Sequence, residues 1–131
     1  AMLAHYKDFD TILLPLNAAD PSYLSFETQV LEEARKQNLG IQGMKSLANA
    51  KLLQSFSVKE CLTYVLSLPI HCLAVGCTTI GQLEDDVRIA QQLEVYSEQE
   101  MAQMRERAQD LSGPGLEDWK RDTLAEPSPS E

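Results

Sequence analysis

The feature that most constrains this fold is an alternation of short apolar runs with longer amphipathic segments, repeated about four times along the chain. The runs are apolar at successive positions, as in the stretch TILLPL of residues 11–16. A strand that is apolar on both faces must be covered on both sides, and in parallel sheets helices provide that cover. The pattern therefore predicts an α/β fold with about four parallel strands that alternate with helices.

The strand candidates lie within residues 10–17, 39–45, 70–76 and 93–97. Between the first two, apolar side chains recur at helical spacing through residues 25–40. Residues 46–56 are expected to form an irregular loop or a short helix, and residues 116–122 one further helical turn.

Three further helices are predicted from their starts. Ser57 and Ser97 are each followed three residues later by glutamate, which is the capping-box pattern, and Thr79 begins a weaker version with Gln82. The helix after Thr79 is expected to turn four apolar residues toward the core: Ile80, Leu83, Val87 and Ala90.

Composition narrows the class of partner. The formal net charge of −9 leaves no basic stripe for nucleic acid. No apolar stretch is long enough to cross a bilayer, and the start lacks a signal-peptide pattern, so we expect a cytoplasmic protein without a membrane partner. Residues 1–123 are predicted to form one domain, and residues 124–131 a disordered tail.

The three cysteines, Cys61, Cys72 and Cys77, lack paired C-x-x-C spacing. We interpret them as small buried apolar residues in a reducing compartment. A metal site built from His71, Cys72 and Cys77 is the weaker alternative, because adjacent residues of a strand point to opposite faces. No metal ligands are therefore predicted.

A candidate site begins where the run HCLAVG ends at Gly76 and a helix opens. The first N–H groups of that helix lack partners and favour an anion, and Thr78 and Thr79 add hydroxyl donors. The alternative is that Thr79 only caps the helix. The acidic residues 84–86 oppose a dense negative charge such as phosphate.

Lys45 is the first choice for a charged site residue, because it follows a predicted strand and functional groups of α/β proteins gather at strand ends. A solvated surface lysine is the alternative. The sequence contains no G-x-S-x-G, no phosphate-binding P-loop and no G-x-G-x-x-G. No catalytic residue is predicted.

Several stretches resemble the aldo/keto reductase family, in particular one of its bacterial-type branches. They are FDTILLPLN, GIQGMKSL, SVKECLTYVLSLPIHCLAVGCTTIGQLEDDVRIAQQLEVYSEQEM and EDWK, in unbroken order over about residues 8–122. The family fold is a TIM (β/α)8 barrel, and the resemblance covers its C-terminal half. It implies a half-barrel whose strands are the family's fifth to eighth, at residues 11–16, 41–44, 71–75 and 93–96.

In that family the catalytic Asp, Tyr, Lys and His come from the first half of the barrel, to which no residue here corresponds. The second half contacts NADP or NAD. By position, the resemblance implies that the loop after the seventh strand faces the nucleotide phosphates and that Gln82 and Asp86 stand near the adenosine end, where Asp86 would repel a 2′-phosphate. The implied cofactor-binding residues are Lys45, Gly76, Cys77, Thr78, Thr79, Gln82 and Asp86.

The resemblance therefore implies an aldo/keto reductase-like half-barrel without independent catalysis and with at most a residual nucleotide-binding loop, where NADP binding is weak or lost. The alternative is the C-terminal half of an NADP-dependent oxidoreductase that is active only with an N-terminal half. A half-barrel exposes an apolar inner face and two strand edges. We therefore expect a homodimer through the open barrel face, or a complementary N-terminal half as partner.

Overall fold

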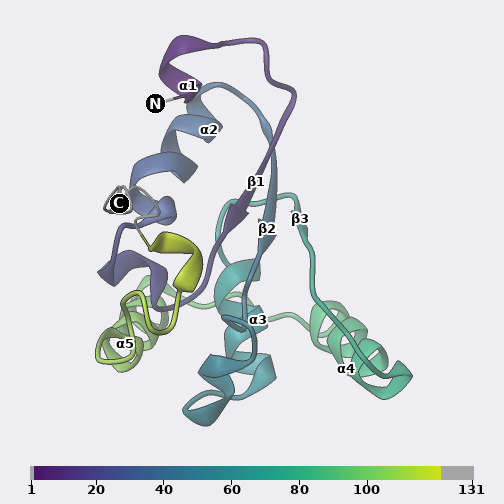
Figure 1. The fold of residues 1–131 in the computed structure, drawn as a ribbon. Helices are drawn as coiled ribbons and strands as arrows, with labels where there is room; N and C mark the ends of the chain where they lie inside the picture. The colour runs from purple at the N-terminus through teal and green to yellow at the C-terminus, as the bar shows by residue number, and fades with distance from the viewer. Residues whose placement is uncertain (1, 122–131) are drawn as a thin grey trace, which may run out of the picture.

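The computed structural model describes residues 2–121 and contains a sheet of three parallel strands in the order β1-β2-β3 (Figure 1). The α/β class and the parallel strands are confirmed. The sheet is open, and the described chain does not form a closed barrel. The strands are β1 (Thr11–Pro15), β2 (Gly40–Met44) and β3 (Cys72–Leu73).

The predicted helices occur in the predicted order, and the structure adds a short helix at residues 2–5 that was not predicted. Both predicted capping boxes are present, because the Ser57 and Ser97 side chains each accept the backbone N–H three residues later and that glutamate accepts the serine N–H. A π-helical stretch (Glu27–Leu31) precedes α2, and 3-10 turns lie at Asp20–Ser22, Lys51–Gln54 and Asp118–Lys120. The α-helices are α1 (Met2–His5), α2 (Glu32–Lys36), α3 (Val58–Leu66), α4 (Ile80–Gln91) and α5 (Glu98–Gln109).

The core lies between β1, β2 and helices α2, α3 and α5. Gly43 in β2 allows close approach here, since a Cβ at this position would lie 3.3 Å from side-chain atoms of Val65, Ile70 and Leu73. The core holds seven large, fully buried apolar side chains: Tyr64, Leu16, Ile41, Leu52, Leu62, Val65 and Cys61. Burial raises the pKa of the Cys61 thiol to about 12, so this cysteine stays a protonated apolar residue, as predicted.

The prediction of a strand at residues 93–96 is wrong. This segment makes no ladder with the sheet; instead the Tyr96 N–H donates to the Ser67 hydroxyl at 2.9 Å, which places the segment against the end of α3. β3 also carries only two paired residues, because the chain leaves the sheet after Ala74. The sheet therefore ends at a short edge strand.

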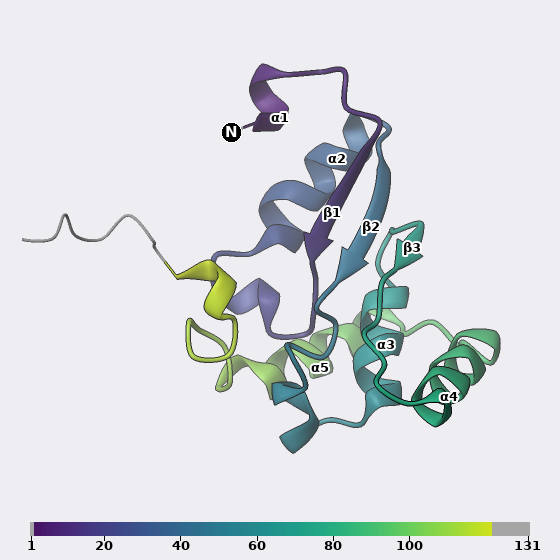
Figure 2. The ribbon, with the colours of Figure 1, turned by 45° about the vertical axis from the view of Figure 1, so that its right-hand side comes forward.

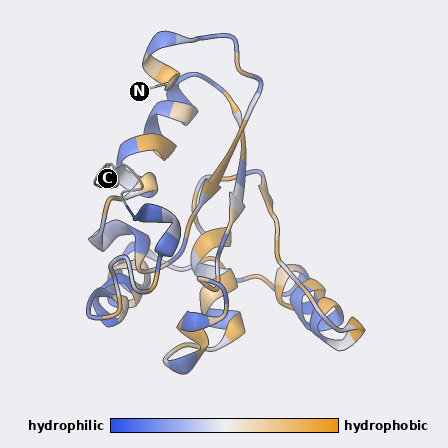
Figure 3. Ribbon diagram, in the orientation of Figure 1, coloured by the Kyte–Doolittle hydropathy of each residue, from blue (hydrophilic) through white to orange (hydrophobic). Residues whose placement is uncertain are grey.

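The prediction that α4 turns its apolar residues inward is also wrong. Ile80, Leu83 and Val87 are exposed by 76%, 53% and 46%, and α4 buries no residue fully. The physical reason is that, among the described elements, α4 packs chiefly against α3, at the end of the molecule away from α1 and α2 (Figures 1 and 2). Figure 3 shows that apolar and polar residues are interspersed along α4.

Two predictions concern the limits of the fold. The tail at residues 124–131 lies outside the described residues. Within residues 2–121, no helix combines the length and the apolar composition that a membrane crossing requires.

Candidate functional site

The candidate site is a cleft at the carboxyl ends of β2 and β3, where the loops that follow these strands face each other. A cavity of about 640 Å³ separates them, and its walls are residues 44–47, 49 and 50 on one side and residues 74–78 on the other. We call this cavity the phosphate cleft, after the ligand that is proposed for it below. It brings together four of the predicted residues, Lys45, Gly76, Cys77 and Thr78.

The loop after β2 has an unusual backbone. Lys45, Ala48, Asn49 and Ala50 all have positive φ angles, of 58°, 49°, 55° and 68°. The left-handed region costs a residue with a Cβ about 1–2 kcal/mol, and such residues gather at functional sites. The Lys45 ammonium donates to the Asn49 side-chain oxygen at 2.7 Å, so the lysine bends over its own loop.

A second cavity of about 650 Å³ lies next to the phosphate cleft, between α3 and α4. We call it the helix cavity. Gly76 and Thr78 line both cavities, while Gln82 and Asp86 line only the helix cavity, together with apolar side chains such as Ile89. Thr79 lines neither cavity.

Thr79 acts as a helix cap, since its hydroxyl oxygen accepts the Gln82 N–H at 3.1 Å. The reciprocal half of the predicted box is shifted by one residue. The Gln82 side-chain oxygen accepts from both the N–H and the hydroxyl of Thr78, at 2.8 and 3.1 Å, and not from Thr79. Both donors of Thr78 are therefore already bonded to the Gln82 side-chain oxygen at the start of α4.

Cys77 donates from its thiol to the Asp86 carboxylate at 3.1 Å, and this hydrogen bond raises the pKa of Cys77. A raised pKa keeps the thiol protonated and makes it a poor nucleophile. The predicted burial of Cys72 and Cys77 is wrong, because both are exposed: β3 is an edge strand, and residues 76–78 form the cleft wall.

Charge in the two cavities is mixed. Among the residues that the structure describes, Lys45 is the single cationic side chain lining the phosphate cleft. In the helix cavity Arg88 forms an ion pair with Asp85 at 2.6 Å, and this pairing weakens the attraction of Arg88 for an anionic ligand. Across residues 2–121, no group of three or more His, Cys, Asp or Glu side chains is arranged to hold a metal ion.

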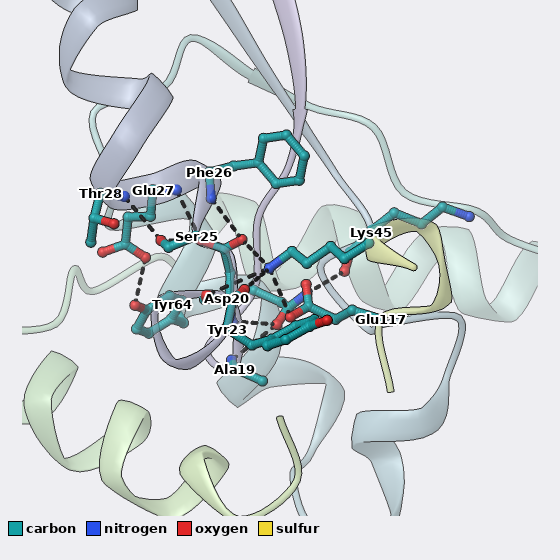
Figure 4. A network of polar contacts seen from close by, with 12 residues as sticks. Ala19, Asp20, Tyr23, Ser25, Phe26, Glu27, Thr28, Lys45, Tyr64 and Glu117 are labelled. Atoms are coloured by element: carbon teal, nitrogen blue, oxygen red, sulfur yellow. Dashed lines mark hydrogen bonds and ion pairs between the residues drawn. The ribbon is translucent and has the colours of Figure 1, made fainter. Parts of the chain in front are cut away.

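A buried polar network at the carboxyl end of β1 was not found from the sequence (Figure 4). Its centre is the Lys120 ammonium, which lies 2.7 Å from Asp20 Oδ1 and 2.9 Å from Glu117 Oε1, with all three side chains at most 2% exposed. The Asp20 carboxylate also accepts from Ser25 and from the N–H groups of residues 26 and 27, at 2.8–3.0 Å. Burial raises the pKa of Glu117 in spite of the ammonium beside it.

The network reaches the phosphate cleft through two contacts. The Asn17 side-chain amide donates to Glu117 Oε2 at 3.2 Å and to the Lys45 carbonyl at 3.4 Å. The Lys45 ammonium lies 5.7 Å from the centre of the Trp119 ring. The turn signal NAADPS and the late EDWK were visible in the sequence, but nothing there indicated that segments 100 residues apart would meet.

Comparison of this chain with protein-family models, with curated proteins and with solved structures gave no match. The resemblance to aldo/keto reductases therefore stays a prediction.

Proposed function

We propose that this chain is a nucleotide-binding half-barrel of aldo/keto reductase type, which holds the phosphates of NADP weakly and performs no hydride transfer by itself. The observation that carries the proposal is the phosphate cleft, where Lys45 faces the loop Gly76–Thr78 across a cavity of about 640 Å³. A cation opposite a strand-to-helix turn is an arrangement that suits phosphate.

The adjoining helix cavity offers a place for the rest of a nucleotide. Its walls include the apolar side chains of Leu53, Val58 and Ile89, which suit a flat aromatic base. Since Gly76 and Thr78 line both cavities, the two cavities adjoin, and one nucleotide could place its phosphate in one and its base in the other. The resemblance to aldo/keto reductases makes NADP and NAD the proposed nucleotides.

Affinity is expected to be low for two reasons. Thr78 and Gln82 already satisfy each other, so a ligand must break hydrogen bonds that the free protein makes. Asp86, which lines the helix cavity, repels negative charge.

Calorimetric titration with NADPH and NADH tests the proposal, with Lys45→Ala as the loss-of-site variant. Lys36→Ala is the matched control, because Lys36 is exposed on α2, where it forms an ion pair with Glu32 at 3.2 Å. We expect weak wild-type binding that Lys45→Ala reduces and Lys36→Ala leaves unchanged. Equal affinity in all three proteins would contradict a site in the phosphate cleft.

The purified chain is expected to show no carbonyl reductase activity, because the general acid and its lysine and histidine partners belong to the half of the barrel that the resemblance does not cover. Oxidation of NADPH above background with simple aldehydes or quinones would overturn this part of the proposal.

A second candidate function is the C-terminal half of an NADP-dependent oxidoreductase that becomes active only with an N-terminal half. It is favoured by apolar side chains that this chain leaves exposed to solvent. Leu13 of the edge strand β1 is 49% exposed, and Ile80, Leu83 and Val87 of α4 are exposed as well. Exposed surface of this kind marks an interface. A complementary half or a second copy of this chain would cover it.

Light scattering separates these two partners. We propose a homodimer through the open face as the default, so a mass near twice 14.6 kDa is expected for the isolated chain. A mass of one chain that is stable on dilution would contradict the homodimer and favour a complementary half.

A further inference from the structure

The C-terminal segment Glu117–Lys120 lies against the loop that carries Lys45, although it is not part of the cleft wall. We infer that this segment is a positioning element: it holds Lys45 in place, so that moving it away weakens anion binding in the phosphate cleft while the sheet stays folded. The inference rests on the proposed function for the role of the cleft, but the contacts that carry it do not depend on any ligand.

The segment is fixed firmly at both ends. Lys120 inserts its ammonium between Asp20 and Glu117 and also donates to the Tyr23 carbonyl at 2.7 Å. Because the side chains of Lys120, Asp20 and Glu117 are buried, each would be left without compensation if the segment moved, and this opposes its release. The segment is therefore tied to the carboxyl end of β1 by a buried ion pair.

Two routes lead from the segment to Lys45. Along the backbone route, Glu117 Oε2 accepts from the Asn17 amide, which also donates to the Lys45 carbonyl. This contact holds the residue whose φ of 58° directs the chain into the cleft wall. Along the side-chain route, the Trp119 ring lies 5.7 Å from the Lys45 ammonium, within the range of a cation–π contact.

Trp119 is suited to a positioning role and not to direct contact with a ligand. Its indole N–H is buried and has no hydrogen-bond partner among the described residues, and the residue lines neither cavity. Its ring packs against the core as a partly buried apolar group. We therefore assign its effect on binding to the contact with Lys45.

The test compares Trp119→Leu with Trp119→Phe, which keeps an aromatic face, and uses NADPH as the probe. We expect Trp119→Leu to weaken binding about two- to fivefold, as loss of an exposed cation–π contact predicts, and Trp119→Phe to restore most of it. Tyr6→Leu is the control, because Tyr6 is an exposed aromatic residue beside α1, remote from the cleft. Unfolding in urea checks that each variant is folded, and Trp119→Met replaces Trp119→Leu if that variant is not.

A second readout needs no nucleotide. Reductive methylation with 13C labels each lysine ammonium, and the Lys45 resonance, assigned with Lys45→Arg, is expected to be shifted by the Trp119 ring. It should move toward the free-lysine position in Trp119→Leu and stay shifted in Trp119→Phe.

The two readouts distinguish failure of the proposed function from failure of this inference. If the wild type binds no NADPH, the proposed function fails, and the Lys45 resonance alone decides whether Trp119 positions the lysine. If NADPH binds with equal affinity to wild type and Trp119→Leu, or if the Lys45 resonance is the same in both, the segment does not position Lys45 and the inference is wrong.

Discussion

The carboxyl ends of β1 and β3 lie at the same edge of the sheet, but their polar groups are arranged in opposite ways. At β1 the charged groups are buried and bond over long sequence distances, as Asp20 does with Lys120. At β3 the polar groups are exposed and bond to near neighbours, as Thr78 does with Gln82 and Cys77 with Asp86. Long-range buried bonds fix a fold, whereas short-range exposed bonds open for a ligand at a smaller cost.

The largest difference is expected from removing a lysine in each kind of environment. Lys120→Met leaves the carboxylates of Asp20 and Glu117 buried without their cation, which costs about 3–5 kcal/mol. Lys36→Met removes one half of an exposed pair and should cost at most about 1 kcal/mol. Urea unfolding measures both, and similar losses in the two variants would contradict the described contrast.

A leucine-to-alanine change made in the segment after each of the two strands compares how much its apolar packing contributes to stability. Leu16 follows β1 and is fully buried, so Leu16→Ala should lower the free energy of unfolding by about 2–5 kcal/mol. Leu83 on α4 is 53% exposed, so Leu83→Ala should change it by no more than about 0.5 kcal/mol. A large loss for Leu83→Ala that depends on protein concentration would instead indicate that α4 is covered by a second copy.

A charge change in the helix cavity should strengthen nucleotide binding. Asp86→Asn removes a carboxylate that lines this cavity, and we expect NADPH affinity to rise on the order of threefold, as for other exposed charge pairs. Glu84→Gln is the matched control, because it removes the same charge from the same helix but does not line either cavity. If calorimetric titration gave the same increase in NADPH affinity for Asp86→Asn and Glu84→Gln, the effect would come from net charge alone and not from the position of Asp86.

The smallest effect concerns pH and the start of α3. A hydrogen bond from Arg107 at 2.6 Å lowers the pKa of Glu60, so this pair stabilises the folded state above pH 4.5 and the stabilisation is lost as pH falls through the lowered pKa. Glu60→Gln keeps the capping box and removes the charge. We expect a loss of about 0.2–1 kcal/mol at pH 7 that becomes smaller at pH 3.

Urea unfolding at the two pH values measures this difference. Equal destabilisation of Glu60→Gln at both would mean that the hydrogen-bond geometry matters and the charge does not.

Local patterns were reliable where a short segment decides its own structure. The capping boxes at Ser57 and Ser97 formed as predicted, because each needs only four consecutive residues. Four of the predicted site residues came to one cavity, because parallel strands end at a common edge.

Predictions failed where the outcome depends on what covers a segment. The helical spacing of Ile80, Leu83 and Val87 is correct, but the described chain supplies no surface for them to pack against. Residues 93–96 have strand-like composition and no strand partner, so they lie against α3 instead. The Asp20–Lys120 network was invisible for a related reason: sequence spacing carries no information on contacts over 100 residues.

Backbone NMR during an NADPH titration tests the central claim most directly, because it records the amide chemical shifts at the carboxyl ends of β1 and β3 in one experiment. We predict amide shift changes in residues 45–50 and 76–82, with smaller ones along the rest of α4. The amides of residues 17–20, in the buried network, should stay unchanged. Shift changes confined to β1 and its exposed edge, or none at all at millimolar NADPH, would contradict a nucleotide site in the phosphate cleft.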